Sequence, residues 1–275
     1  MRTLLIDTDV LVYSSAFGAQ KTRYTLETDC GEQLTFENSK LCKEFVKEKG
    51  FEEDTYKITP WLDLLDEHVA LKIAENNLNN VKTAIAGASR FELYLTGKGN
   101  YREQVAVSAV YKGNRKADKP VHYQAVKDWF LNSAGAILCE GQEADDMLGI
   151  RSTELGSQGI ICTIDKDLNQ VIGLHYDWDK DLKYKVNKEQ GDRFFCQQLL
   201  SGDATDNIPA LAGIGTKTAM KILDGLSGKE MFDKVRETYE HKGKDDTYLT
   251  EQGRLLWIRR KRNELWDIKS FEESL

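Results

Sequence analysis

Acidic residues gather in four short clusters, and these are the residues of this chain best suited to carry chemistry. Three clusters follow one another between residues 140 and 206, and a fourth lies upstream. Their members are Asp7, Asp9, Glu143, Asp145, Asp146, Asp165, Asp167, Asp203 and Asp206. Several follow apolar runs, where a carboxylate is costly unless it is paired or binds a metal. Because few basic residues interrupt the clusters, and Mg²⁺ prefers oxygen ligands, the pattern predicts metal binding.

The spacing within the sequence EADD adds detail to this prediction. On a helix, Glu143 and Asp146 fall on one face because they are three residues apart. Asp146 then lies between its acidic neighbours, so we expect it to bridge two metal positions. The alternative is a helix N-terminus whose acidic residues only offset the helix dipole. The three further clusters favour the metal site.

A stretch rich in basic and aromatic residues covers residues 97–120 and is the predicted contact with nucleic acid. The residues expected to touch it are Lys98, Tyr101, Arg102, Tyr111, Lys112, Arg115 and Lys116. Lys112 and Arg115 are three apart, so one helical turn would direct both at the same phosphate. Tyr101 and Tyr111 are candidates for stacking on unpaired bases. The alternative is a solvated basic loop.

A glycine turn follows the last acidic cluster and is predicted to bind a phosphate of a duplex. Gly213 and Gly215 open a predicted helix that carries Lys217 in its first turn. Backbone N–H groups at such a turn form an anion site. A second basic run, Arg259–Arg262, is either a further contact with nucleic acid or, more commonly for such a run, a solvated helix face.

The composition is that of a soluble globular protein, with 40% hydrophobic and 30% charged residues among 275. No apolar run reaches the roughly 20 residues that span a bilayer. The N-terminus lacks the pattern of a signal peptide, and five scattered cysteines without CxxC spacing indicate a reducing cytoplasm. Net charge is −7, but the acidic clusters account for all of it, so an acidic balance does not exclude nucleic acid.

Short apolar runs predict the strands of a parallel sheet. They cover residues 3–6, 91–95, 136–139, 159–164 and 174–178. Helical segments alternate with them, which is typical of a doubly wound α/β fold. Ligands of such sheets bind beyond the carboxyl ends of the strands. Asp7, Glu143, Asp165 and the basic stretch all follow strand ends, so we expect one site there.

Two further segments give local predictions without a function. Residues 24–37 alternate about a Cys-Gly turn, which predicts a β-hairpin. Residues 61–85 carry apolar residues at helical spacing and predict a long helix.

Six motifs in this order resemble the 5′-nuclease family of flap endonucleases and 5′-exonucleases, with the short bacteriophage members nearest. They are IDTD, YKGNRK, EADD, TIDKD, GDATDN and GIGTKTA, and together they cover most of residues 1–225. The resemblance implies a PIN-like domain over residues 1–190, with a basic arch or clamp at about 97–120. It implies a helix-two-turn-helix element for duplex DNA within residues 191–275.

The resemblance also implies roles for matching residues. Asp7, Glu143, Asp145 and Asp146 would hold a first Mg²⁺. Asp165, Asp167, Asp203 and Asp206 would hold or orient a second, with Mn²⁺ as a substitute. Lys112 and Arg115 match the basic pair that steers the scissile phosphate, and Asp146 and this pair are the expected catalytic residues. The turn from Gly213 through Gly215 to Lys217 matches the duplex-binding turn, where the family often binds K⁺.

The expected activity is metal-dependent hydrolysis at or near DNA 5′ ends, by a two-metal mechanism, in phage DNA replication or recombination within the host cytoplasm. Expected partners are DNA with a 5′ end, flap or branch, and RNA in RNA–DNA hybrids; replication proteins are not identified. One departure is that many relatives carry an Asp after the second strand, where this chain has Gly97. Asp9 is the residue expected to compensate. The alternatives are a branched-DNA-binding protein without catalysis and a PIN-type ribonuclease.

Overall fold

The computed structural model describes residues 2–115 and 118–275 and divides the chain into two compact units. The first contains residues 1–10, 80–118 and 131–275, and the second contains residues 11–79 and 119–130. This division differs from the boundary expected near residue 190. The reason is that the C-terminal segment is hydrogen-bonded into the first unit: Gln170 Nε2 donates to the carbonyl of Leu256 at 2.8 Å.

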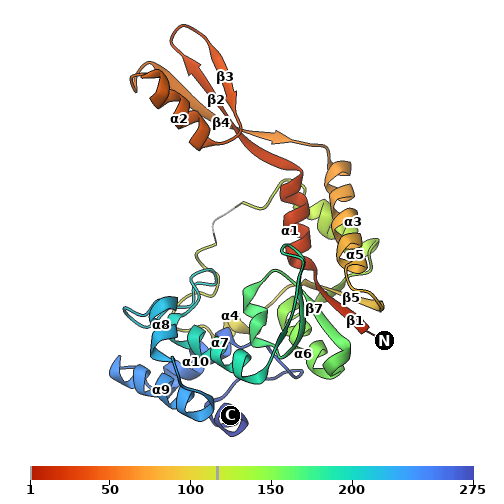
Figure 1. Ribbon diagram of the computed structural model, residues 1–275, viewed down its shortest axis with the longest axis vertical. Helices are drawn as coiled ribbons and strands as arrows, with labels where there is room; N and C mark the ends of the chain where they lie inside the picture. Colours follow the sequence, from red (N-terminus) through yellow and green to blue (C-terminus); the bar gives the residue numbers. More distant parts are fainter. Residues whose placement is uncertain (1, 116–117) are drawn as a thin grey trace. The chain divides into compact units, whose positions relative to one another are not determined.

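A six-stranded sheet forms the centre of the first unit (Figure 1). Its strands are β1 (Arg2–Asp7), β5 (Ala88–Thr96), β6 (Ile137–Cys139), β7 (Gly159–Cys162), β8 (Gly173–Asp177) and β9 (Leu182–Val186). Their order is β6-β5-β1-β7-β8-β9, and all pairs are parallel except β8 with β9. The five predicted strands are confirmed. The apolar runs of β1 and β7 are almost wholly buried, as expected for central parallel strands.

The register brings the carboxyl ends of four strands to one edge. Asp7 pairs with Tyr94, Ile6 with Cys162 and Thr96 with Cys139. The chain adds β5 and β6 on one side of β1 and then returns to place β7 on the other side. The end of β1 is therefore the point where the strand order reverses, which is where ligands of open α/β sheets bind.

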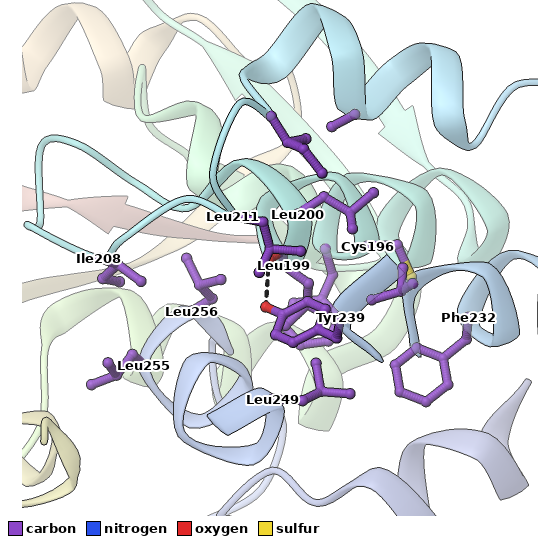
Figure 2. Packing of buried hydrophobic residues seen from close by; sticks show 14 of the residues in the cluster. Cys196, Leu199, Leu200, Ile208, Leu211, Phe232, Tyr239, Leu249, Leu255 and Leu256 are labelled. Atoms are coloured by element: carbon purple, nitrogen blue, oxygen red, sulfur yellow. Dashed lines mark hydrogen bonds between the residues drawn. The ribbon is translucent and has the colours of Figure 1, made fainter. Parts of the chain in front are cut away.

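Helices and short 3₁₀ turns complete the first unit. They are α4 (Tyr101–Val105), α6 (Ala144–Leu155), η1 (Gly156–Gln158), η2 (Lys166–Gln170), α7 (Lys188–Ser201), α8 (Thr216–Ile222), α9 (Gly228–His241), α10 (Asp246–Leu256) and α11 (Ile268–Ser274). Helix α7 packs against α8, α9 and α10 around a second apolar core. Figure 2 shows Tyr239 at its centre, where the buried hydroxyl donates to the carbonyl of Leu199 at 2.6 Å. A donor buried in an apolar cluster needs such a partner.

The contact between α10 and Trp266 leaves no room for a side chain at Gly253. A Cβ built at Gly253 would lie 2.2 Å from the Trp266 ring. We expect Gly253→Ala to lower the free energy of unfolding by about 1–3 kcal/mol because the core would be overpacked. Urea unfolding would measure this change. Gly215→Ala is the matched control, since a Cβ at Gly215 meets nothing within 4 Å; equal effects of the two substitutions would contradict the explanation.

The second unit contains a three-stranded antiparallel sheet and helices. Its elements are β2 (Gln20–Thr28), β3 (Gln33–Phe36), α2 (Ser39–Lys49) and β4 (Tyr56–Leu64). Helices α1 (Thr8–Gly18), α3 (Glu67–Thr83) and α5 (Tyr123–Asn132) each have residues in both units. The predicted hairpin is confirmed as β2 and β3.

The helix predicted from residue 61 is wrong at its start. Strand β4 pairs with β2 along nine residues and includes Pro60, and α3 begins only at Glu67. Proline is tolerated because β4 is an edge strand of the order β3-β2-β4. Within the described residues, no helix is long and apolar enough to cross a membrane.

Candidate active site

Asp7 lies at the end of β1 and is almost fully buried, at 2% exposure. Its carboxylate accepts a hydrogen bond from Thr163 Oγ1 at 2.7 Å and one from the Val10 N–H at 3.4 Å. Burial raises the pKa of Asp7 to about 7, and the nearby charges of Asp9 and Asp165 add to the rise. A carboxylate in such a place is stable as an anion only if a cation neutralises it.

Three further carboxylates also have raised pKa values, for the same reasons as Asp7. Burial raises the pKa of Asp145 well above its ordinary value, and the charges of Asp7 and Asp165 raise it further. The pKa of Asp165 is also raised, first by burial and then by Asp206 and Asp203. Burial and the charge of Asp165 raise the pKa of Asp167 to about 8. Members of all four acidic clusters therefore act on one another, as a shared site requires.

A small cavity of about 30 Å³ opens among these acids. Glu143, Asp145, Asp167, Asp203 and Asp206 line it. This volume is enough for an ion or a water molecule, and the donor set consists of the hard oxygen atoms that Mg²⁺ prefers. Among residues 2–115 and 118–275, however, no three His, Cys, Asp or Glu side chains are grouped closely enough to hold a metal ion as they stand. The donor set suits a divalent cation, but its side chains must first regroup.

The reason for this arrangement is that basic side chains hold two of the acids. Lys112 is paired with Glu143, and its Nζ lies 3.6 Å from Asp206. Arg115 is paired with Asp206 at 2.6 Å. The buried Tyr111 hydroxyl donates to Asp206 at 2.8 Å and lies 3.1 Å from Glu143. As their spacing predicted, Lys112 and Arg115 point to the same side, although they reach carboxylates in this conformation.

The backbone also docks the basic segment onto the loop of the last acidic cluster. The Lys112 N–H donates to the carbonyl of Asp206 at 2.8 Å, and Asn114 donates to the carbonyl of Ala204 at 2.6 Å. Lys112 has a positive φ of 56°, which is uncommon for a residue other than glycine. Such backbone strain is found most often at functional sites. The segment is therefore held in one particular position beside the acids.

Asp146, which was expected to bridge two metal positions, is bound instead by basic residues in this structure. Its carboxylate is fully buried, and both oxygens accept hydrogen bonds from Arg102, at 2.7 and 3.0 Å. The Arg259 N–H donates to it as well, at 3.1 Å. Burial alone would raise the pKa of Asp146, but Arg102 outweighs this and lowers it. Asp146 also closes the capping box of α6 with Glu143, so both of its oxygens are engaged within the protein.

Three of the predicted nucleic-acid contacts are corrected by the same geometry. Arg102 is 2% exposed and is fully engaged with Asp146 and backbone carbonyls. The guanidinium carbons of Arg102 and Arg259 lie 4.7 and 3.7 Å from the centroid of the Tyr101 ring. The ring is therefore already covered and does not stack on a base. The Tyr111 ring is buried. These side chains are packed within the protein and support the acidic residues of the site.

The remaining predicted contacts are accessible or lie outside the described residues. Lys98, Gly213, Gly215 and Lys217 are exposed. Gly213 has a φ of 78°, which suits glycine, and α8 begins directly after Gly215. Lys116 lies outside the described residues.

Comparison with known proteins finds similarity to DNA polymerase I, to a 5′-3′ exonuclease and to a phage protein of known structure. DNA polymerase I of Caldicellulosiruptor bescii is 30% identical over 171 residues, which are 52% of this chain and 20% of that protein. A 5′-3′ exonuclease of Buchnera aphidicola is 29% identical over 182 residues, covering 60% of each. The T5 D15 protein, co-crystallised with metal ions, superposes with a TM-score of 0.53 at 14% identity, over 93% of this chain and 89% of that one. No family model matches.

The chain resembles the 5′-nucleases. The structural likeness confirms the expected fold, a PIN-like and mostly parallel sheet with helices on both faces. This chain spans only a fifth of the polymerase and 60% of the exonuclease.

The structure explains the departure from the 5′-nuclease pattern after β5. A Cβ at Gly97 would lie 2.6 Å from the carbonyl oxygen of Cys139 and 2.9 Å from the Glu140 carboxyl carbon, so an aspartate does not fit there. Asp9 accepts a hydrogen bond from the Thr96 N–H at 3.0 Å, and Glu140 accepts one from the Lys98 N–H at 2.9 Å. Two other carboxylates thus stand at the end of β5.

Two neutral residues of the site were not among the residues predicted from the sequence. Thr163 joins β7 to β1 by its hydrogen bond to Asp7, and Gln198 donates from α7 to Asp167 at 2.9 Å. Thr163 follows the last residue of β7 and stands two residues before Asp165, so it was open to prediction as a strand-end residue. Gln198 could not be predicted from the sequence, because its contact with Asp167 depends on how α7 packs beside η2.

Proposed function

We propose that this chain is a metal-dependent 5′-nuclease that hydrolyses phosphodiester bonds at or near DNA 5′ ends. The observation that carries the proposal is the group of buried or half-buried acids Asp7, Asp145, Asp165 and Asp167, whose pKa values are all raised by burial and by neighbouring carboxylates. Mutually repelling carboxylates are maintained where cations bind them. The likeness to 5′-3′ exonucleases supports this choice of reaction.

The proposed ligands form two groups that meet at Asp165. Asp7 and Asp145 belong to the first group, and Asp167, Asp203 and Asp206 belong to the second. Asp165 adds to the raised pKa of Asp7, and its own pKa is raised by Asp203 and Asp206, so it neighbours both groups. We therefore assign the linking position to Asp165 in place of Asp146. Bound Mg²⁺ or Mn²⁺ would supply Lewis-acid activation of water and stabilise charge on the phosphate.

The basic segment has two successive tasks in this proposal. Without a cation, Lys112 and Arg115 neutralise Glu143 and Asp206. With cations bound at these acids, Lys112 and Arg115 would be free to hold the scissile phosphate and to stabilise its developing charge. Tyr111 and Thr163 keep Glu143 and Asp7 oriented through their hydroxyl groups.

We assign duplex binding to the turn before α8. Gly213 and Gly215 are exposed there, and Lys217 stands in the first turn of the helix. The helix-two-turn-helix element, a K⁺ ion at the turn between Gly213 and Lys217, and contact of Lys98 with DNA all belong to this proposal. RNA within RNA–DNA hybrids is a second proposed substrate, and a role in phage DNA replication remains part of the same proposal.

The test uses two 5′-labelled DNA duplexes, one with a 5′ flap and one with a blunt 5′ end. With Mg²⁺ we expect cleavage at least about 10³-fold faster than in EDTA, because the metal-free site lacks its main source of charge stabilisation. Release of a flap-length fragment would identify a flap endonuclease. Release of short products from the blunt end would identify an exonuclease.

The competing function is a branched-DNA-binding protein without catalysis, which the aspartate missing at Gly97 favours. Tight binding of the flap in a gel shift, with neither duplex cut in Mg²⁺ or Mn²⁺, would establish that function and remove the nuclease. A PIN-type ribonuclease would cut single-stranded RNA and leave both duplexes intact.

A further inference from the structure

The chain between α4 and the buried Tyr111 leads directly to Lys112 and Arg115, yet much of it lies in solvent. Val107 is 85% exposed and Val110 is 75% exposed. Side chains this exposed bury little apolar surface and therefore contribute little to holding the chain in place. Few buried apolar contacts are typical of a segment that opens locally. The position of residues 107–110 must therefore depend on polar contacts.

The carboxylate of Glu251 supplies these contacts. Its Oε1 accepts hydrogen bonds from the N–H of Val107 at 2.7 Å and from the N–H of Ser108 at 2.6 Å. Its Oε2 accepts one from the Ser108 hydroxyl at 2.7 Å. Hydrogen bonds to an ionised acceptor are shorter and roughly twice as strong as those between neutral groups. Because both carboxylate oxygens bind two adjacent residues, they fix the position and the direction of the chain there.

Glu251 belongs to α10, which also holds the helix before this stretch. Leu249 and Leu255 of α10 are buried in the second apolar core, so the helix is firmly packed. The carbonyl of Leu255 accepts a hydrogen bond from Arg102 Nε at 2.8 Å, and the carbonyl of Arg254 accepts one from the Tyr101 hydroxyl at 3.4 Å. Helix α4 and the residues that follow it are thus both bound to α10.

The other contacts of the basic segment involve proposed cation ligands. Lys112 binds the carbonyl of Asp206 through its N–H and the carboxylate of Glu143 through its side chain, and Arg115 pairs with Asp206. These contacts compete with cations for the same acids. The bonds of Glu251 involve none of the proposed ligands, so they can persist when cations are bound.

We propose that Glu251 is a positioning residue, which holds Val107 and Ser108 on α10 so that Lys112 and Arg115 face the scissile phosphate. The inference rests on the proposed nuclease function and adds to it a residue that contacts neither substrate nor cation. Since the N–H groups need an acceptor at a defined place, we expect the length of the side chain to matter more than its charge.

Amide hydrogen exchange, followed by NMR in EDTA without DNA, tests whether Glu251 holds the segment. In Glu251→Ala we expect the amides of Val107 and Ser108 to exchange about tenfold faster, while those of α7 keep their protection. Glu251→Gln should largely retain protection, because its amide oxygen can still accept from both N–H groups. Glu251→Asp keeps the charge but is one methylene shorter, so it should resemble Glu251→Ala. Glu240→Ala is the matched control, since Glu240 is exposed on α9.

Cleavage of the labelled flap duplex tests the role in the reaction. In Glu251→Ala we expect kcat to fall about tenfold and KM to change less than about twofold, because misplaced basic side chains weaken contacts made in the transition state. Duplex binding by the turn before α8 should be unaffected. Glu251→Gln should recover most of kcat, which a general loss of stability would not explain.

Four results would overturn the proposal. The first is unchanged exchange of Val107 and Ser108 in Glu251→Ala. The second is faster exchange throughout α7 as well, which would indicate general destabilisation. The third is a response that follows charge, with Glu251→Asp like the wild type and Glu251→Gln like Glu251→Ala. The fourth is faster exchange at the two amides with unchanged kcat.

Failure of the nuclease proposal itself would have a different signature. A wild type that cuts neither duplex would overturn that function, and with it the role of Glu251 in the reaction. The exchange measurement uses neither metal nor DNA, so it would still decide whether Glu251 holds the segment.

Discussion

The substitution Asp145→Asn is expected to reduce DNA cleavage by about 10³-fold or more, because it removes a carboxylate from the centre of the proposed cation site. The same substitution should leave the protein at least as stable as the wild type in EDTA. Burial and the charges of Asp7 and Asp165 raise the pKa of Asp145 well above its ordinary value. Replacing this carboxyl group by a neutral amide therefore removes repulsion at slightly alkaline pH.

Cleavage of the labelled flap substrate and thermal unfolding in EDTA would measure the two effects, and calorimetric titration with Mg²⁺ would show the loss of affinity. Asp224→Asn is the matched control, since Asp224 is exposed on the surface after α8. Asp145 would lose its assigned role if the variant cleaved at a rate near that of the wild type. Lower activity that only followed a lower melting temperature would also contradict it.

The sequence predicted those strands whose residue pattern is distinctive without knowledge of the tertiary structure. The runs that form β1 and β7 are apolar without interruption, because both faces of these strands are buried. Strand β9 was not predicted, since it alternates exposed lysines with apolar residues at the sheet edge. Strand β4 was mistaken for the start of α3 because Trp61, Leu62 and Leu64 fit helical spacing as well as a partly exposed edge strand.

The site was predictable as a set of residues but less so as a set of contacts. Strand ends that share one edge brought the acidic clusters together, as parallel topology requires. The partner of Asp146 could not be read from spacing, because Arg102 comes from α4 and its contact depends on tertiary packing. For the same reason, Tyr111 became a buried hydrogen-bond donor to the acids although its sequence neighbours suggested an exposed aromatic platform.

In contrast to Asp145→Asn, the substitution Asp146→Asn at the adjacent position is expected to lower the free energy of unfolding by about 3–5 kcal/mol. The substitution leaves the guanidinium of Arg102 buried without a countercharge, and that residue is only 2% exposed. The pKa of Asp146 is lowered by Arg102 in spite of burial, so its ionised form stabilises the folded chain above the ordinary pKa of an aspartate. This contribution is lost as pH falls through the lowered value.

Urea unfolding of Asp146→Asn beside Asp145→Asn tests the contrast, because the same chemical change is made at neighbouring positions of α6. The double variant Arg102→Met, Asp146→Leu should be destabilised by less than the sum of the two single changes, since it removes both charges together. Recovery would be partial, because Arg102 also donates to the carbonyls of Leu255 and Trp257. If Asp146→Asn were as stable as the wild type and yet inactive, Asp146 would have to be a metal ligand after all, and Arg102 would be its displaceable partner.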